Sequence, residues 1–141
     1  MIIIVCLDDN GGMTFNHRRQ SRDRAVTERI RQIARGKKLW MNSYSYKLYG
    51  DIEGAETIEA EDFLDRAGTG ELCLLETGSL AGVEAKIDEV IVFGWNRTYP
   101  SDFRLDLELS GFSRTDVREF PGASHEKITE ARYVRRLAST T

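Results

Sequence analysis

Hydrophobic and polar positions along this chain form short blocks that predict strands alternating with helices. Residues 2–7 (IIIVCL) are a continuous, β-branched run, which is typical of a strand buried on both faces of a sheet. Residues 71–75 (ELCLL) and 89–95 (EVIVFGW) are similar runs, and residues 38–41 predict a shorter strand. This alternation favours a mostly parallel sheet with helices on both faces.

The segment after the first strand predicts an amphipathic helix. Val26, Ile30 and Ile33 follow one another at helical spacing, so they define an apolar face. Ser21 stands where a helix N-cap is expected, and Gly36 follows the last apolar position as a closing glycine. We therefore expect the helix to begin soon after Ser21 and to end at Gly36.

Four shorter segments predict smaller elements. Residues 43–50 (SYSYKLYG) either begin a helix or form a loop that carries three tyrosines. Residues 57–58 predict a short strand that leads into a helix within the acidic stretch 60–67. Residues 80–85 predict a helix of one or two turns.

The C-terminal part of the chain predicts an antiparallel hairpin. Residues 112–119 and 127–137 alternate enough to pair, and PGASHE joins them as a turn. The expected architecture is thus a three-layer α/β fold that ends in a hairpin. Ligands bind beyond the carboxyl ends of the strands in such sheets. The loops expected to matter are 8–20, 42–50, 76–80 and 94–102.

Length and composition add limits on domain number and location. A chain of 141 residues suits a single domain, 1–141, and its apolar share of 40% is enough for a core. No basic leader precedes the first apolar run, and no run approaches the roughly 20 apolar residues of a membrane span. Cys6 and Cys73 lie in apolar runs, which predicts buried, reduced thiols. We expect a cytoplasmic protein.

Charge is unevenly distributed along the chain. Residues 17–38 carry nine Arg and Lys against two acids, about +7, which leaves about −10 elsewhere because the whole chain has a net charge of −3. The asymmetry indicates either an anion-binding face or a basic helix that pairs with acids in the fold, such as the acidic segment 51–65.

The order of the motifs resembles the dihydrofolate reductase family over nearly the whole chain. MIIIVCLDDNGGMTFN is similar to that family's opening strand and mobile loop, and GKKLWMNSYSYKLYG to its G-K-P-V-I-M-G-R-x-T segment. CLLETGSL stands in place of V-I-G-G-x-x-[LV]-Y, and IDEVIVFGWN with Asp102 in place of A-D-x-L-Y-L-T and its aspartate. FSRTDVREF and SHEKITEARYVRR resemble the closing hairpin. The resemblance implies the reductase fold.

Departures from the family pattern argue against its chemistry. The family's catalytic acid falls at Val26, and the arginine of the G-R-x-T turn is lost in residues 42–45 (NSYS). The double glycine becomes Glu76-Thr77, which places a carboxylate where a pyrophosphate would approach the backbone. The interval between Met41 and Ile58 also looks too short for the family's third strand. We therefore expect no dihydrofolate reduction and no tight NADPH binding.

Two groups of residues are candidates for ligand binding. Arginines before the first helix can bind phosphate or carboxylate in bidentate fashion. Tryptophan, asparagine and arginine after the strand at 89–95 can form one side of a pocket, or a loop closed by an Arg97–Asp102 pair with Trp95 inside. The candidate contacts are Asn16, Arg18, Arg19, Arg22, Asn42, Tyr44, Trp95, Asn96 and Arg97.

Candidate catalytic groups are few. Glu76 at a strand end is a candidate general base, and His125 in the last turn is its candidate partner, although an exposed turn histidine is the simpler interpretation. The two histidines form no metal motif, and no serine stands in a nucleophile-elbow motif.

The sequence therefore favours a reductase-fold domain that binds a small anionic or nucleotide-like ligand. One alternative is a divergent reductase that uses NADPH or a flavin. Another is an interaction or nucleic-acid-binding module that uses the basic segment 17–38, with tyrosine and tryptophan side chains as stacking platforms.

Overall fold

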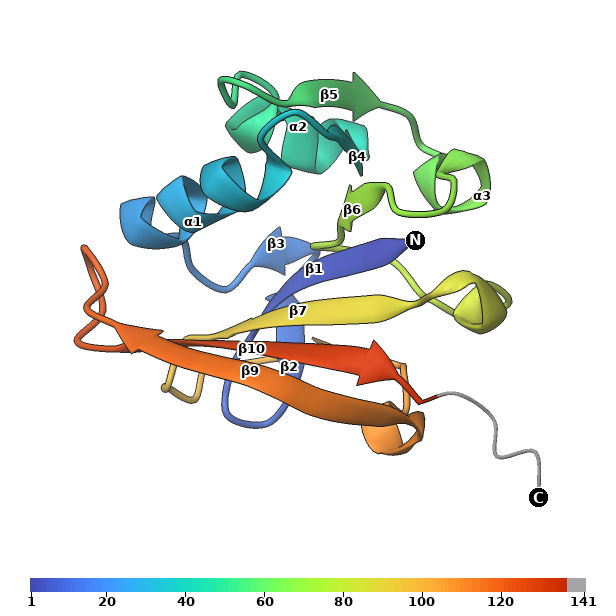
Figure 1. Cartoon of the computed structure of the whole chain (residues 1–141). Helices are drawn as coiled ribbons and strands as arrows, with labels where there is room; N and C mark the ends of the chain where they lie inside the picture. Colours follow the sequence, from blue (N-terminus) through green and yellow to red (C-terminus); the bar gives the residue numbers. More distant parts are fainter. Residues whose placement is uncertain (137–141) are drawn as a thin grey trace.

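The structure, a computed structural model, describes residues 1–136. A seven-stranded sheet within this range has the order β5-β4-β6-β1-β7-β10-β9 (Figure 1). Its strands are β1 (Ile2–Leu7), β4 (Lys38–Met41), β5 (Glu56–Glu59), β6 (Leu72–Leu74), β7 (Glu89–Gly94), β9 (Phe112–Phe120) and β10 (Ile128–Arg135). The first five strands in this order are parallel, and β10 pairs antiparallel with both β7 and β9. The mostly parallel sheet and the C-terminal antiparallel hairpin are thus confirmed.

Strand β1 lies in the middle of the sheet, which explains its unbroken apolar sequence. It pairs with β6 on one side and with β7 on the other. Ile3 and Val5 pack into the core on one face of the sheet, while Ile4 packs into the core on the opposite face. A strand buried on both faces has no position for a polar side chain.

Helices cover both faces of this sheet, as the sequence predicts. Helix α1 (Arg24–Ala34) and helix α2 (Ser43–Tyr49) pack on the face of Ile4. The short helix α3 (Phe63–Arg66) packs on the other face. The apolar stripe of α1 is buried through Val26, Ile30 and Ala34.

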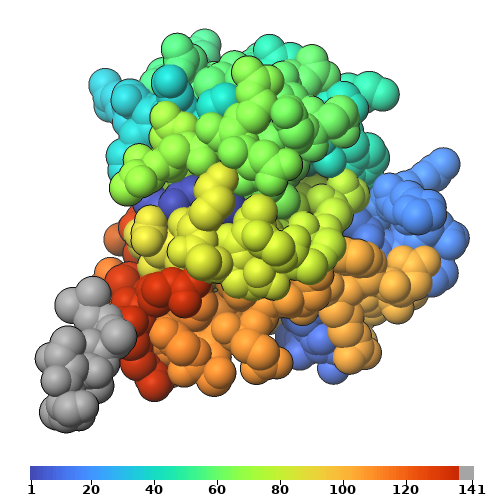
Figure 2. Space-filling view, turned by 90° about the vertical axis from the view of Figure 1, so that its right-hand side faces the viewer, coloured from blue at the N-terminus to red at the C-terminus, as the bar shows by residue number. Residues whose placement is uncertain are grey.

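A second, three-stranded sheet, not anticipated from the sequence, covers the rest of the face on which α3 packs. It has the order β3-β2-β8 and consists of β2 (Gly12–Phe15), β3 (Arg18–Arg19) and β8 (Phe103–Arg104). Met13 anchors it in the core. In the space-filling view, the β2–β3 hairpin and the segment around β8 form one projection from the surface (Figure 2).

The start of α1 differs from the expected one. Asp23, rather than Ser21, is the N-cap residue, and its carboxylate accepts a hydrogen bond of 2.8 Å from the Ala25 N–H. The other end agrees with the prediction, since Gly36 has a φ of 75° directly after the C-cap residue Arg35.

Two of the smaller predictions are settled by the structure. Residues 43–49 form helix α2 rather than a loop. Residues 80–85 do not form a helix of one or two turns, because the single short turn there is the 3₁₀ helix η1 (Glu84–Lys86). A second 3₁₀ turn, η2 (Leu109–Gly111), precedes β9.

The expectation that the interval between Met41 and Ile58 is too short for the family's third strand is wrong, because the short strand predicted at residues 57–58 is present as β5. Strand β5 begins at Glu56 and pairs in parallel with all four residues of β4. The connection is short because α2 has only seven residues. This departure from the family pattern therefore no longer argues against cofactor binding.

Both cysteines are free thiols, as predicted, but Cys6 is only half-buried, whereas both were expected to be buried. Cys6 in β1 and Cys73 in β6 are both unpaired thiols. Cys73 is buried, and this burial raises its pKa to about 12. In residues 1–136 no helix is both long enough and apolar enough to span a membrane.

Candidate functional site

The carboxyl ends of β1, β4, β6 and β7 meet at one edge of the sheet, and an ion pair occupies the middle of that edge. Glu76 follows β6, and its carboxylate accepts two hydrogen bonds from the Arg19 guanidinium, of 2.7 Å at Nε and 2.9 Å at Nη2. The Ser45 hydroxyl donates a third, of 2.8 Å. The hydrogen bonds that Arg19 donates to Glu76 raise the pKa of Arg19.

Helix α2 completes the surroundings of this ion pair. The Arg19 guanidinium lies 4.5 Å from the centre of the Tyr44 ring, and the Tyr44 hydroxyl accepts a hydrogen bond from the Arg19 N–H. Asn42 caps α2 through the Ser45 N–H and donates to the Thr77 hydroxyl. The structure therefore brings Arg19, Asn42 and Tyr44 close together. Their polar groups are engaged within the chain, Arg19 with Tyr44 and Glu76, and Asn42 with Thr77.

The edge between β1 and β7 is closed in a similar way. Asp8 follows β1, and its buried carboxylate accepts hydrogen bonds from the Gly12, Asn10 and Tyr99 N–H groups and from the Gln20 amide. Burial alone would raise the pKa of Asp8, but these four donors lower it below its usual value.

Little space remains beneath these contacts. The hollow lined by Cys6, Trp95 and Glu76 at the strand ends has a volume of about 10 Å³, enough for about one water molecule. The Trp95 side chain, directly after β7, lines this hollow and is only 3% exposed. The expected ligand crevice is therefore filled by side chains of the chain itself.

His125 is buried, so its interpretation as an exposed turn residue is wrong. Its Nδ1 lies 2.9 Å from the Asp23 carboxylate, and its Nε2 lies 2.9 Å from the Tyr99 hydroxyl and 3.1 Å from the Ser21 hydroxyl. The Trp95 ring stacks on the imidazole with centroids 4.7 Å apart. A carboxylate only accepts, so Nδ1 carries a proton and donates it to Asp23.

Asp23 is the fixed point of this cluster. Besides the His125 ring, it accepts from the N–H groups of Ala25, Ala123 and Ser124. Burial alone would raise its pKa, but these donors outweigh burial and hold the pKa of Asp23 well below its usual range. The carboxylate joins the start of α1 to the β9–β10 turn.

Ser21, His125 and Asp23 have the order of groups that activates a serine nucleophile, but not its access. The Tyr99 hydroxyl lies closer to the same Nε2 than the Ser21 hydroxyl does. The hollow that Ser21 lines admits about one water molecule, so no acyl group fits beside it. The cluster links three segments, namely the residues before α1, the loop after β7 and the β9–β10 turn, and we call it the brace. Glu76 and His125 line different hollows.

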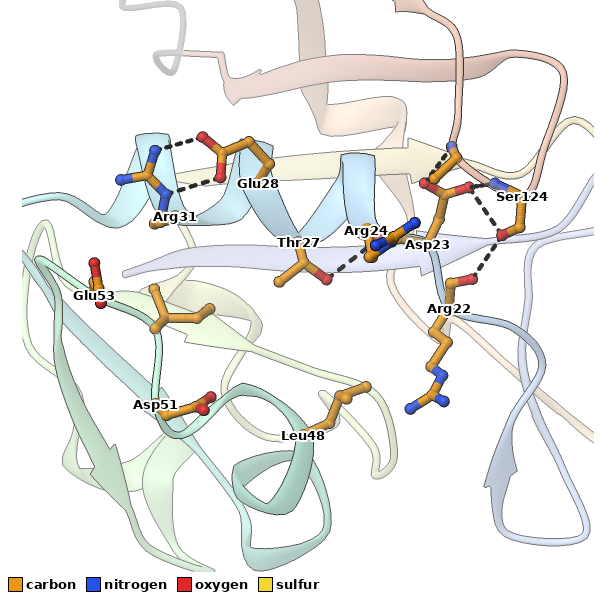
Figure 3. A pocket seen from close by; sticks show the side chains of 12 residues that line it. Arg22, Asp23, Arg24, Thr27, Glu28, Arg31, Leu48, Asp51, Glu53 and Ser124 are labelled. Carbon is orange, nitrogen blue, oxygen red and sulfur yellow. Dashed lines mark hydrogen bonds and ion pairs between the residues drawn. The ribbon is translucent and has the colours of Figure 1, made fainter.

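An open groove lies beside this brace, between α1 and the segment from α2 to β5 (Figure 3). Its volume of about 700 Å³ is within the range of small-molecule sites. Leu48 and Ile52 supply apolar surface on one side, and Thr27 of α1 lies on the other. Ala123 and Ser124 of the β9–β10 turn close one end.

Charges of both signs line the groove. Arg22 and Arg24 stand where α1 begins, and Asp51 and Glu53 stand on the connection between α2 and β5. All four are exposed, and within residues 1–136 none of them lies within 4 Å of an opposite charge. Arg31, by contrast, forms an ion pair with Glu28 one turn earlier on α1.

The structure distributes the predicted ligand residues over separate places. Arg22 lines the groove just described. Asn16, Arg18 and Arg19 line a hollow of about 580 Å³ beside Tyr99, on the projecting hairpin. Trp95, Asn96 and Arg97 line a third hollow, of about 330 Å³, together with His125. No single hollow gathers all of them.

Two of the predicted internal pairings take other forms. The Asp102 carboxylate accepts from the Asn16 N–H, and within residues 1–136 it forms no ion pair with Arg97. The basic helix does not pair with the acidic segment 51–65; its Arg29 pairs with Glu130 of β10 instead. Asn96 has a φ of 58°, and its side-chain amide donates hydrogen bonds to the Lys127 carbonyl, just before β10, and to the Thr129 hydroxyl in β10.

Several site residues escaped the sequence analysis. Asp8 and Tyr99 bond across 91 positions of sequence, and Asp23 reaches Ser124 across 101. The only sequence signal for Asp8 is that the turn-forming residues 9–12 (DNGG) follow it directly. Within residues 1–136, no group of three or more His, Cys, Asp or Glu residues is placed to hold a metal ion.

Comparison with known proteins identifies the fold. No protein-family model matches the sequence, and no curated protein matches it at a significant level. The fold is similar to that of dihydrofolate reductase from Enterococcus faecalis, a structure complexed with NADP(H) and RAB-propyl, with a TM-score of 0.69 and 12% sequence identity over 96% of each chain. At this identity the likeness establishes the fold and leaves the chemistry to this chain's own residues.

Proposed function

We propose that this chain, which has a dihydrofolate reductase-like fold, binds a small anionic ligand in the groove between α1 and the α2–β5 connection and does not reduce dihydrofolate. The observation that carries the proposal is the open groove with unpaired Arg22 and Arg24 at its rim. Its volume and its apolar surface at Leu48 and Ile52 suit a small organic molecule.

Guanidinium groups, rather than helix amides, would hold the anion. Helix α1 begins at this end of the groove, but the Asp23 carboxylate already accepts the Ala25 N–H and brings a negative charge to the helix start. Arg22 and Arg24 are free of ion pairs with the other described residues and can each offer two parallel N–H donors to a carboxylate or phosphate.

Three features of the same structure argue against inherited reductase chemistry. Val26, which falls where the family has its catalytic acid, is 1% exposed and packs in the core under α1. The hollow that Cys6, Glu76 and Trp95 line at the ends of β1, β6 and β7 has only about 10 Å³, which holds neither a nicotinamide nor a pterin ring. The pair of Arg19 and Glu76 occupies the edge where a dinucleotide would approach.

A thermal-shift screen with hexanoate, glucose 6-phosphate and adenosine 5′-monophosphate tests the proposal, with NADPH as the cofactor comparison. We expect at least one of the three anions to raise Tm by about 3 °C at ten times its Kd. NADPH is expected to give no shift at micromolar concentration. The shift should be lost in Arg22→Ala/Arg24→Ala.

The matched control is Arg18→Ala/Arg97→Ala, which also removes two exposed guanidiniums but from the other two hollows. This variant should keep the full shift. If the control loses the shift and Arg22→Ala/Arg24→Ala keeps it, the anion site lies at the hairpin or at the β7 end. If none of the anions stabilises the wild type, the proposal is wrong.

A further inference from the structure

The charged residues of the groove that form no ion pair with the other described residues are separated by sign, and anion binding alone does not use this separation. Asp23, Glu28 and Arg31 also line the groove, but Asp23 contacts His125 and Arg31 pairs with Glu28. The cationic side chains Arg22 and Arg24 come from the start of α1, whereas the anionic side chains Asp51 and Glu53 come from the α2–β5 connection. In Figure 3, Leu48 lies between the guanidinium of Arg22 and the carboxylate of Asp51. The charges thus face the groove from different places, with apolar surface between them.

These opposite charges do not neutralise one another. Neither Arg22 nor Arg24 lies within 4 Å of Asp51 or Glu53, although all four line the same groove. Two other arginines of α1 do form ion pairs: Arg31, which also lines the groove, pairs with Glu28, and Arg29 pairs with Glu130 of β10. The space between the two sets therefore matches a ligand that carries both charges itself.

We propose that the ligand is dipolar: an anionic group faces Arg22 and Arg24, and an ammonium or guanidinium group faces Asp51 and Glu53. A short apolar spacer lies over Leu48 and Ile52. This inference rests on the proposed function and names the chemical class of its ligand. Carboxylate partners for a cation add affinity by attraction and add specificity by disfavouring a second anionic end.

A series of ω-amino carboxylates from 4-aminobutanoate to 8-aminooctanoate tests the inference, each compared with its parent carboxylate by NMR titration of the wild-type chain. At the length that spans the groove, the amino group should tighten binding about fivefold, because the acids are solvent-exposed and each pair contributes modestly. The amine without a carboxylate, hexylamine, should bind more weakly than 6-aminohexanoate.

Three variants assign this gain to its residues. In Asp51→Asn/Glu53→Gln the amino group should no longer tighten binding, and the Kd of the parent carboxylate should stay unchanged. Glu56→Gln/Glu59→Gln removes two exposed acids outside the groove and should keep the gain. Arg22→Ala should weaken both members of each pair.

The outcomes separate the two proposals. If parent carboxylates bind through Arg22 but no amino group tightens binding, or if the gain survives Asp51→Asn/Glu53→Gln, the dipolar inference is overturned and the anion site stands. At about 20 mM ligand even a weak site is populated. If no member of the series shifts the NMR signals of the groove residues at that concentration, the anion site itself is overturned.

Discussion

At the scale of single residues, the structure gives Glu76 a different role from the one that the sequence predicts. Glu76 stands where the resemblance places glycine, and in isolation its charge would repel a pyrophosphate. In the folded chain its charge is matched by Arg19, so the obstacle is the bidentate pair itself. The sequence identifies both residues as candidates but not their contact, because 57 positions separate them.

A double-mutant cycle on Arg19 and Glu76 measures this pair. Each single alanine substitution should destabilise the chain by about 2 kcal/mol, because it leaves a partly buried charge without its partner. The coupling energy from urea unfolding should be about 1–3 kcal/mol. The exposed, equally bidentate pair of Arg31 and Glu28 is the control, and its coupling energy should be clearly smaller because solvent screens it. Equal coupling in the two cycles would contradict the assignment.

Asp23 makes a second prediction at this scale, on the pH dependence of stability. Its pKa is lowered on folding, so its stabilising effect is complete above the unfolded value of about 3.9 and is lost as pH falls through the lower folded value. Asp23→Asn should therefore cost about 2 kcal/mol or more at pH 7 and a smaller amount at pH 2.5, which lies between the folded and unfolded pKa values. Urea unfolding of both proteins at the two pH values measures this difference, and a cost independent of pH would refute it.

At the scale of elements, helix α1 shows what a pattern determines and what it leaves open. Val26 and Ile30 are buried as the periodicity predicts, whereas Ile33 is only half-buried and Ala34 completes the buried face. The N-cap was mistaken because Ser21 and Asp23 are both good cap residues, and the choice depends on the distant β9–β10 turn. That turn also explains why His125 is buried rather than exposed.

Replacing Val26 with aspartate returns an acid to the position that the resemblance assigns to the catalytic group. The side chain is buried among apolar groups of the core beneath α1, so Val26→Asp should destabilise the chain by about 3 kcal/mol or more. Val26→Ala, which removes volume without adding a carboxyl, should cost about 1–2 kcal/mol less. Urea unfolding compares the two.

No reductase activity should appear in the Val26→Asp variant, since the filled strand ends still exclude the cofactor. Oxidation of NADPH by dihydrofolate, followed by absorbance, provides the assay. Turnover above that of the wild type would show that the carboxyl group alone had been missing, which is contrary to our account of the site.

At the scale of the whole molecule, the fold was predictable and the site was not. The mostly parallel sheet, the two helical faces and the closing hairpin follow from buried runs, helical spacing and the order of motifs, whereas the order of the strands and the second sheet were not predicted. The groove arises only when α1, the α2–β5 connection and the β9–β10 turn come together. Its residues carry no motif, and exposed charges in three distant segments look alike in sequence.

The central claim is that ligands bind in the groove beside α1 rather than at the filled strand ends. Backbone ¹H–¹⁵N chemical-shift mapping with the anion that gives the largest thermal shift tests it most directly. We predict perturbed amides at Arg22, Arg24, Leu48 and Ser124, with no change at Asp8, Asn42, Glu76 or Trp95. Perturbation confined to the second set would place the ligand at the strand ends and contradict the claim.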